Sequence, residues 1–217
     1  MNEENKIEPQ LIIIICVLSL VLATILLTII LLIVKRCKKK RLEKQKKLEN
    51  KEIIDIDSEL RNIKKFMPNS EVINDNQYQL PNNLNFKSGK ILINKYGLFV
   101  INEFNEDWKL IEGDFNNREW TISNNNIKSE IKNLFWDLKS NIEFIIPILP
   151  KNVPIIGLFV FGKIKEFDIN NCPEYILYSN VSDLCNTMFQ IKKSLKPIIS
   201  VENISKISEL LKNKILK

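Results

Sequence analysis

The chain has 217 residues, five glycines, no histidine and a formal net charge of +6. Without histidine it cannot use Ser-His or Cys-His catalysis or imidazole metal ligands, and without a glycine-rich run it cannot form a phosphate loop or a dinucleotide fingerprint. Residues 35–47 contribute +8 and residues 1–10 contribute −2, so residues 48–217 are neutral. The basicity belongs to a short segment and does not by itself indicate a nucleic-acid-binding domain.

The first predicted element is a transmembrane helix over residues 11–34. This stretch of twenty-four residues carries no charge, and at about 1.5 Å per residue it exceeds the roughly 30 Å hydrocarbon core of a bilayer. A secretory signal would begin with a basic region and end at a small-residue cleavage site, whereas residues 1–10 hold three Glu and one Lys, and no such site follows. The sequence therefore predicts a single-pass anchor.

A basic connector over residues 35–55 follows the span. Positive residues next to a span remain in the cytoplasm, so we predict that residues 1–10 lie outside the cell membrane and that residues 56–217 form a cytoplasmic domain. The connector has no Gly or Pro, which favours a helical stalk. Its basic residues act either as a topology signal alone or also as contacts to anionic membrane lipids; the interface residues are Lys35, Arg36, Lys38, Lys39, Lys40 and Arg41.

The cytoplasmic part begins with an amphipathic helix over residues 57–67. Leu60, Ile63 and Met67 share one face of this helix, and Asp57 or Ser58 can cap its start. Alternating apolar residues and turn-forming residues then predict a series of strands; these cover residues 71–80, 86–94, 98–104, 108–111 and 119–122, with turns at Tyr96-Gly97 and at 113–117.

Helices and buried strands alternate in the remainder of the chain. Apolar residues at helical spacing predict a long helix over residues 125–143; they are Ile127, Ile131, Leu134, Phe135, Leu138 and Ile142. Residues 153–162 are apolar on both faces, which is typical of a central strand, and residues 175–179 predict another strand. Asn180 and Ser200 are expected to cap the last two helices.

The segment from Ile91 to Asn105, ILINKYGLFVINEFN, followed by Gly113 and Trp120, resembles the nuclease-related domain family called NERD. The resemblance covers roughly residues 56–190 and is most specific at residues 97–101. It implies an α/β fold in which the N-terminal transmembrane helix is followed by a restriction-endonuclease-like αβββαβ domain with a mixed central sheet.

In that fold, two carboxylates hold Mg²⁺, and a Lys two residues after the second carboxylate stabilises charge or positions water. Carried over to this sequence, the family's Asp falls on Gly89, its Glu on Asn102 and its Lys on Phe104. The Gln of the family's helix falls near Ser129. All four positions are replaced, so the resemblance implies a degenerate site with neither catalysis nor a cofactor, in which Asn102 is a hydrogen-bonded remnant and Phe104 fills the old pocket.

A displaced nuclease site is the alternative, with Glu59, Glu103 and Asp114 as the candidate acids. Glu59 falls where the family's first helix carries a Gly-Glu pair. Glu103 points to the strand face opposite Asn102, so it could replace the missing Glu only through a bulge or a register slip. Mg²⁺ is expected only if such a site exists.

The sequence thus supports three functions. The first is a membrane-anchored NERD-like domain that binds or scaffolds without catalysis, and the second is an active Mg-dependent nuclease with a displaced site. The third is a membrane-tethered protein interaction module that exposes Trp108, Trp120 or Trp136. The neutral charge of the domain favours a cytoplasmic protein partner, whereas the resemblance keeps nucleic acid open.

Overall fold

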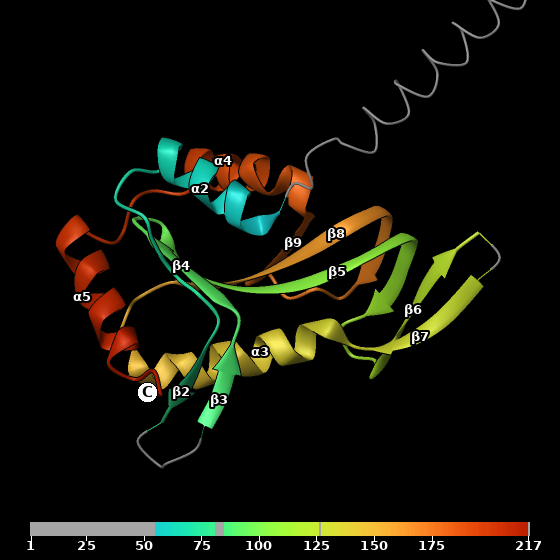
Figure 1. Cartoon of the computed structure of the whole chain (residues 1–217), viewed down its shortest axis with the longest axis horizontal. Helices are drawn as coiled ribbons and strands as arrows, with labels where there is room; N and C mark the ends of the chain where they lie inside the picture. The colour runs from blue at the N-terminus through green and yellow to red at the C-terminus, as the bar shows by residue number, and fades with distance from the viewer. Residues whose placement is uncertain (1–54, 81–84, 126, 217) are drawn as a thin grey trace, which may run out of the picture. The chain divides into compact units, whose positions relative to one another are not determined.

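The computed structural model describes residues 55–80, 85–125 and 127–216, which belong to one unit, Ile54–Lys217 (Figure 1). The predicted transmembrane helix over residues 11–34, the stalk up to residue 54 and the six basic interface residues lie outside the described residues. Within the described ranges, no helix combines the length and the apolar character that a membrane span requires.

A mixed seven-stranded sheet forms the centre of the domain (Figure 1). The longest strand, β5, pairs antiparallel with β4 at its start and with β6 near its end, and it pairs in parallel with β8 along most of its length. β1 extends the sheet beyond β4, β7 beyond β6, and β9 beyond β8. The strands are β1 (Glu71–Ile73), β4 (Lys90–Asn94), β5 (Gly97–Asp114), β6 (Glu119–Asn124), β7 (Ile127–Lys132), β8 (Ile155–Asn170) and β9 (Ile176–Asn180). The mixed α/β class and the mixed central sheet are confirmed.

Helices cover both faces of the sheet (Figure 1). α2 (Ile56–Phe66) and α4 (Leu184–Ser194) pack on one face, against Phe99 and Ile101 of β5. α3 (Leu134–Ile145) and α5 (Val201–Lys212) belong to the core on the other face, with Leu98 and Val100. Successive side chains of a strand point to opposite faces, so both cores draw on the same apolar strands.

The predicted strands over residues 71–80 and 86–94 are each divided in two. The chain leaves β1 at residues 74–75 and forms a separate two-stranded sheet from β2 (Asn76–Gln79) and β3 (Asn85–Ser88), before Gly89 leads into β4. The alternation of buried residues is interrupted at both breaks: the buried Ile73 and Tyr78 are five positions apart, and Gly89 is followed by the continuously buried run that begins at Ile91.

The predicted long helix over residues 125–143 is wrong in its first half. Residues 127–132 form β7, which pairs with β6 across a turn in which Asn125 has a φ of +50°. The helix α3 begins only at Leu134, where Asn133 caps it by accepting a hydrogen bond from the Phe135 amide at 3.0 Å. Ile127 and Ile131 fit both a helical and an alternating spacing, and hairpin pairing decided between the two.

The helix caps were predicted with mixed success. Ser200 caps α5 as expected, since its side chain accepts a hydrogen bond from Asn203 N at 3.2 Å. α2 is capped by Asp55 rather than by Asp57 or Ser58, because Asp55 Oδ1 accepts from Ser58 N at 2.6 Å. Asn180 does not cap the turn η2 (Val181–Asp183) or α4; its side chain instead exchanges two hydrogen bonds with the backbone of Ile164.

Strand β5 is longer than the sequence indicated, and it absorbs the predicted strand over residues 108–111. Its register against β8 shifts between Phe104 and Asp107, where an irregularity separates two regular stretches of parallel pairing. β8 is buried from Gly157 to Phe161, and it lies between β5 and β9, which confirms its prediction as a central strand. A short turn, η1 (Ile146–Ile148), links α3 to the segment before β8.

Candidate functional site

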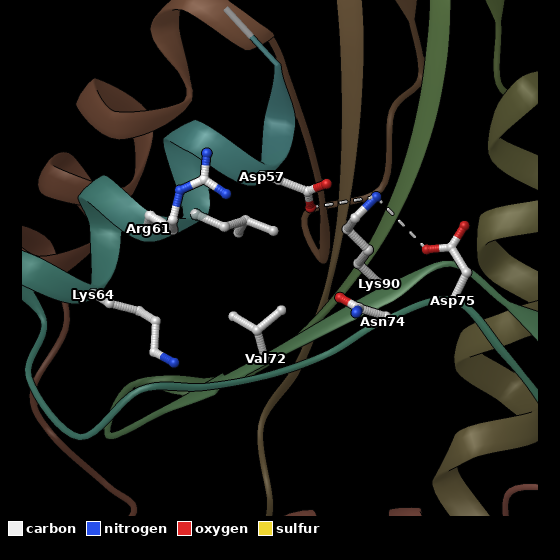
Figure 2. A pocket seen from close by; sticks show the side chains of 8 residues that line it. Asp57, Arg61, Lys64, Val72, Asn74, Asp75 and Lys90 are labelled. Atoms are coloured by element: carbon white, nitrogen blue, oxygen red, sulfur yellow. Dashed lines mark ion pairs between the residues drawn. The ribbon is translucent and has the colours of Figure 1, made fainter.

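A charged cluster lies where β4 begins, on the face of the sheet that α2 covers. Lys90 Nζ donates to Glu103 Oε1 at 2.6 Å and lies 3.7 Å from Asp57 Oδ1 and 3.8 Å from Asp75 Oδ1. Figure 2 shows the ammonium group of Lys90 between the two aspartates. We call these four residues the Lys90 cluster. The side chains of Lys90 and Glu103 are only 13% and 21% exposed.

Strand register explains how Lys90 meets Glu103. Lys90 is paired with Ile101 across the β4–β5 hairpin, and a residue two positions further along a strand lies on the same face. Glu103 therefore points to the α2 side and Asn102 to the α3 side, so the two lie on opposite faces of the strand, as predicted. Asp57 reaches the cluster from the first turn of α2, and Asp75 reaches it from the segment between β1 and β2.

The cluster holds Lys90 in its charged form. Burial lowers the pKa of Lys90, but the hydrogen bond that Lys90 donates to Glu103 and the charges of Glu103, Asp75 and Asp57 outweigh this effect and raise the pKa above its ordinary value of 10.5. An ammonium group with a raised pKa cannot act as a general base near neutral pH. Lys90 therefore stays positively charged near neutral pH, and its charge partly neutralises the three surrounding carboxylates.

A cavity of about 470 Å³ opens beside the cluster, between α2 and β1. Leu60 and Val72 supply its apolar surface, while Arg61 and Lys64 lie along its α2 side (Figure 2). Arg61 donates to the Ser58 hydroxyl at 2.7 Å, within the same helix. The cavity therefore carries cations on its α2 side and the Lys90 cluster at its end.

The positions where the resemblance expects catalysis lie on the opposite face, under α3. Asn102 Oδ1 accepts a hydrogen bond from Asn141 Nδ2 of α3 at 3.3 Å, so Asn102 is hydrogen-bonded as predicted. Phe104 packs edge-on against Phe161, with ring centroids 6.2 Å apart. A cavity of about 570 Å³ lies here and brings Gly89 together with Asn102; its polar lining from α3 is Asp137, Ser140 and Asn141. The same cavity reaches Asp75, Lys90 and Glu103 of the Lys90 cluster.

Gly89 cannot be exchanged for a carboxylate on this backbone. A Cβ atom at Gly89 would collide with the carbonyl oxygen of Ile101 and would lie 2.9 Å from Asn102 Oδ1. A strand carbonyl cannot move aside as a flexible side chain can. The residues present therefore do not fit a Mg²⁺ site: one expected ligand position has no room for a side chain, and the other holds a neutral amide.

The three displaced acids do not converge. Glu59 lies on α2 and accepts a hydrogen bond from Asn62 at 3.4 Å, whereas Glu103 is bound to Lys90. Asp114 is at the far end of β5, roughly 35 Å along the strand from Glu103 at about 3.3 Å per residue, and its carboxylate accepts from Asn171 at 2.6 Å. Within residues 55–80, 85–125 and 127–216, no group of three or more Asp, Glu, Cys or His side chains could hold a metal ion.

Ser129 is also not where the prediction put it. It lies on β7, opposite Ile122, and not on the helix that lines the cavity. The α3 residues that reach Asn102 are instead Asn141 and its neighbours in the 570 Å³ cavity. The error follows from the wrong start of α3, because residues before Leu134 are not helical.

The tryptophans differ in exposure. Trp120 is buried against Phe135, so its prediction as an exposed contact residue is wrong. Trp136 is 40% exposed, and its indole nitrogen donates to the carbonyl of Phe115 at 2.8 Å, which ties α3 to the neighbouring turn. Trp108 is half-buried and donates to Glu106 at 2.8 Å.

The convergence of the Lys90 cluster is not apparent from the sequence. Local patterns indicate Asp57 only as a helix cap and give no signal for Asp75. Most of the side chains of Lys90 and Glu103 is buried, which the charge of these residues does not indicate. The four residues are spread over 47 positions from 57 to 103, so no local spacing could have indicated their contact.

The chain matches no family model, no curated protein and no solved structure. Two glycines that contribute to the resemblance to the nuclease-related family have defined positions in the structure. Gly97 has a φ of +157° and ends the turn before β5. Gly113 lies so close to the indole of Trp120 that a Cβ atom there would overlap the ring.

Proposed function

We propose that this protein is a single-pass membrane protein whose cytoplasmic domain has a restriction-endonuclease-like core, related to the NERD family, and binds or scaffolds a partner without catalysis. The order of elements supports the fold assignment: α2, then the antiparallel strands β1, β4 and β5, then α3 and the parallel strand β8. The β2–β3 and β6–β7 hairpins are additions to this core.

One observation supports the proposal that the domain lacks catalytic activity. At the positions that should hold two carboxylates, the domain has Gly89, which has no space for a side chain, and Asn102, which is bound to a second amide on α3. A neutral amide pair cannot hold Mg²⁺ or activate water as two carboxylates do. Phe104, at the expected Lys position, supplies no charge.

The cavity under α3 supports a binding role. It offers amide groups from Asn102 and Asn141, the hydroxyl of Ser140 and the carboxylate of Asp137 beside apolar side chains. Such a mixture of polar groups and apolar surface is typical of ligand and peptide sites. Because residues 48–217 are neutral in total, we propose a cytoplasmic protein as the partner in preference to nucleic acid.

The anchor and the loss of catalysis are tested on the full chain. Extraction of membranes with alkaline carbonate is expected to leave the chain in the pellet, and deletion of residues 11–34 is expected to release it. The purified chain in detergent, supplied with Mg²⁺ and DNA or RNA, is expected to show no cleavage above the level of its Glu103→Ala variant. Cleavage that Glu103→Ala abolishes would establish the displaced nuclease instead.

The binding role is tested by crosslinking in intact membranes. Asp137→Lys inverts a charge in the cavity under α3, whereas Glu130→Lys inverts an exposed charge on β7 and serves as the matched control. We expect Asp137→Lys alone to lose the crosslinked protein. If the chain is instead retained on nucleic acid with a steep salt dependence, the partner is a nucleic acid.

A further inference from the structure

Exposed apolar residues follow one another at the end of α4 and in the loop before α5. Phe189, Leu195, Ile198 and Val201 are 41%, 42%, 64% and 53% exposed. We call these four residues the Ile198 patch. Several large apolar side chains exposed within one short stretch of the chain mark a contact surface.

Backbone hydrogen bonds fix the loop between α4 and α5, which contains Leu195 and Ile198 of the Ile198 patch. The amides of Ile198 and Ile199 both donate to the carbonyl of Lys95, at 2.8 and 3.0 Å, in the turn between β4 and β5. Ile199 is buried in the core with α5, whereas its neighbour Ile198 faces outward. The exposure of Ile198 is therefore a feature of a fixed loop, since the backbone hydrogen bonds orient it.

The charged residues between Phe189 and Val201, the ends of the Ile198 patch, are all positive. Between Phe189 and Val201 the chain contains Lys192, Lys193 and Lys196 and no acidic residue. Lys193 Nζ lies 4.7 Å from the centroid of the Phe189 ring, so cation and apolar surface are in contact. The next acidic residue, Glu202, is paired with Lys206 at 2.7 Å.

We propose that the Ile198 patch docks the domain onto the anionic surface of the bilayer in which its own anchor lies. Apolar side chains inserted at the headgroup level, with lysines directed to lipid phosphates, are the usual composition of an interfacial membrane contact. This stretch has no acidic residue that an anionic surface would repel. The inference rests on the proposed anchor at residues 11–34.

The tether is long enough for this contact. Residues 35–54 span up to roughly 65 Å when extended, at about 3.3 Å per residue. The patch lies near the C-terminal end of α2, since Lys192 Nζ donates to the Phe66 carbonyl at 2.8 Å, and α2 is only about 16 Å long. Docking therefore requires the predicted helical stalk to bend or to extend, because a straight helix of this length is about 30 Å long.

Quenching of tryptophan fluorescence by brominated acyl chains tests the proposal on the full chain in vesicles. Ile198→Trp places the probe in the patch. Ile127→Trp is the matched control, because Ile127 is also 64% exposed but lies on the β6–β7 hairpin, on the other side of the domain from α5 (Figure 1). We expect Ile198→Trp to show quenching above that of the unsubstituted chain in vesicles that contain phosphatidylglycerol, and no excess in pure phosphatidylcholine.

Removal of charge gives a second measurement. Lys193→Gln and Lys196→Gln are each expected to lower the ratio of docked to undocked domain by about fivefold, and Lys192 is left intact because it ties α4 to α2. Equal quenching in both kinds of vesicle, or no excess for Ile198→Trp, overturns the docking surface. Release of the chain from membranes by alkaline carbonate would refute the anchor and not the docking surface. Excess quenching of Ile198→Trp, measured in vesicles before any carbonate is added, would still establish the docking surface in that case.

Discussion

Replacement of Lys90 by Met tests whether the Lys90 cluster stabilises the domain. Met keeps the apolar stem and removes the ammonium group, so Glu103 loses its 2.6 Å partner and keeps only a hydrogen bond from Asn105 at 3.4 Å. A hydrogen bond to a charged group contributes about 1.5–3 kcal/mol. Glu103 can turn partly to water, because its side chain is 21% exposed, which lowers the expected loss to about 1–2 kcal/mol.

The assay is urea unfolding followed by tryptophan fluorescence. The three tryptophans of the chain, Trp108, Trp120 and Trp136, all belong to the domain, so the full chain can be measured in detergent micelles. The control is Lys163→Met, since Lys163 is 82% exposed and its 3.6 Å pair with Asp107 lies at the surface. Such surface pairs contribute less than about 1 kcal/mol.

A double-mutant cycle with Glu103→Gln isolates the pair itself. We expect the double variant to lose about 1 kcal/mol less than the sum of the two single variants. If Lys90→Met and Lys163→Met lower the free energy of unfolding equally, or if the two changes at Lys90 and Glu103 are additive, the cluster does not stabilise the fold and the reasoning is refuted.

The pH dependence has a definite sign. The pKa of Lys90 in the folded domain is raised above its ordinary value of 10.5, so its stabilising contribution is complete below the unfolded value and disappears as the pH rises through the folded value. The difference in unfolding free energy between the unsubstituted chain and Lys90→Met should therefore be constant from neutral pH to about pH 10. It should decrease only at higher pH.

Three further predictions concern single residues. Gly89→Ala should lower the free energy of unfolding by about 1–3 kcal/mol, because its Cβ would collide with the carbonyl of Ile101; an unchanged urea midpoint would contradict this contact. Asn133→Ala should lose about 2–4 kcal/mol, since Asn133 caps α3 and donates to three carbonyls in the turn at residues 114–117; thermal unfolding measures it. Burial raises the pKa of Cys185 to about 12, so iodoacetamide at pH 8 should modify Cys185 slowly in the folded domain and rapidly in urea, as peptide mapping would show.

Local patterns in the sequence were sufficient for several elements. The amphipathic spacing of Leu60 and Ile63 predicts α2, and Ser200 followed by an apolar stripe predicts α5 with its cap. The apolar run over residues 153–162 predicts the buried strand β8. In each case the information lies within a few residues, because helix caps and the burial of one face depend on neighbours in sequence.

The same local patterns predicted the wrong element where one spacing of apolar residues fits both a helix and a strand. Ile127 and Ile131, four positions apart, satisfy a helix and also a strand, and only pairing with β6 made the segment β7. The length of β5 was likewise underestimated, because the polar residues 105–107 separate two apolar stretches, and parallel pairing with the distant strand β8 joins these stretches into one strand. Hydrogen bonding to a partner strand is not encoded in a single segment.

For the candidate site, the sequence by itself determined which face each residue takes. The alternation along β5 was enough to separate Asn102 from Glu103, and the structure has them on opposite faces of the sheet. Tertiary structure alone decided their partners: Asn141 of α3 for Asn102, and Lys90, which also lies close to Asp57 and Asp75, for Glu103. The physical reason is that side-chain direction follows from the geometry of one strand, whereas contact between distant charges requires the packing of α2 and β4 against it.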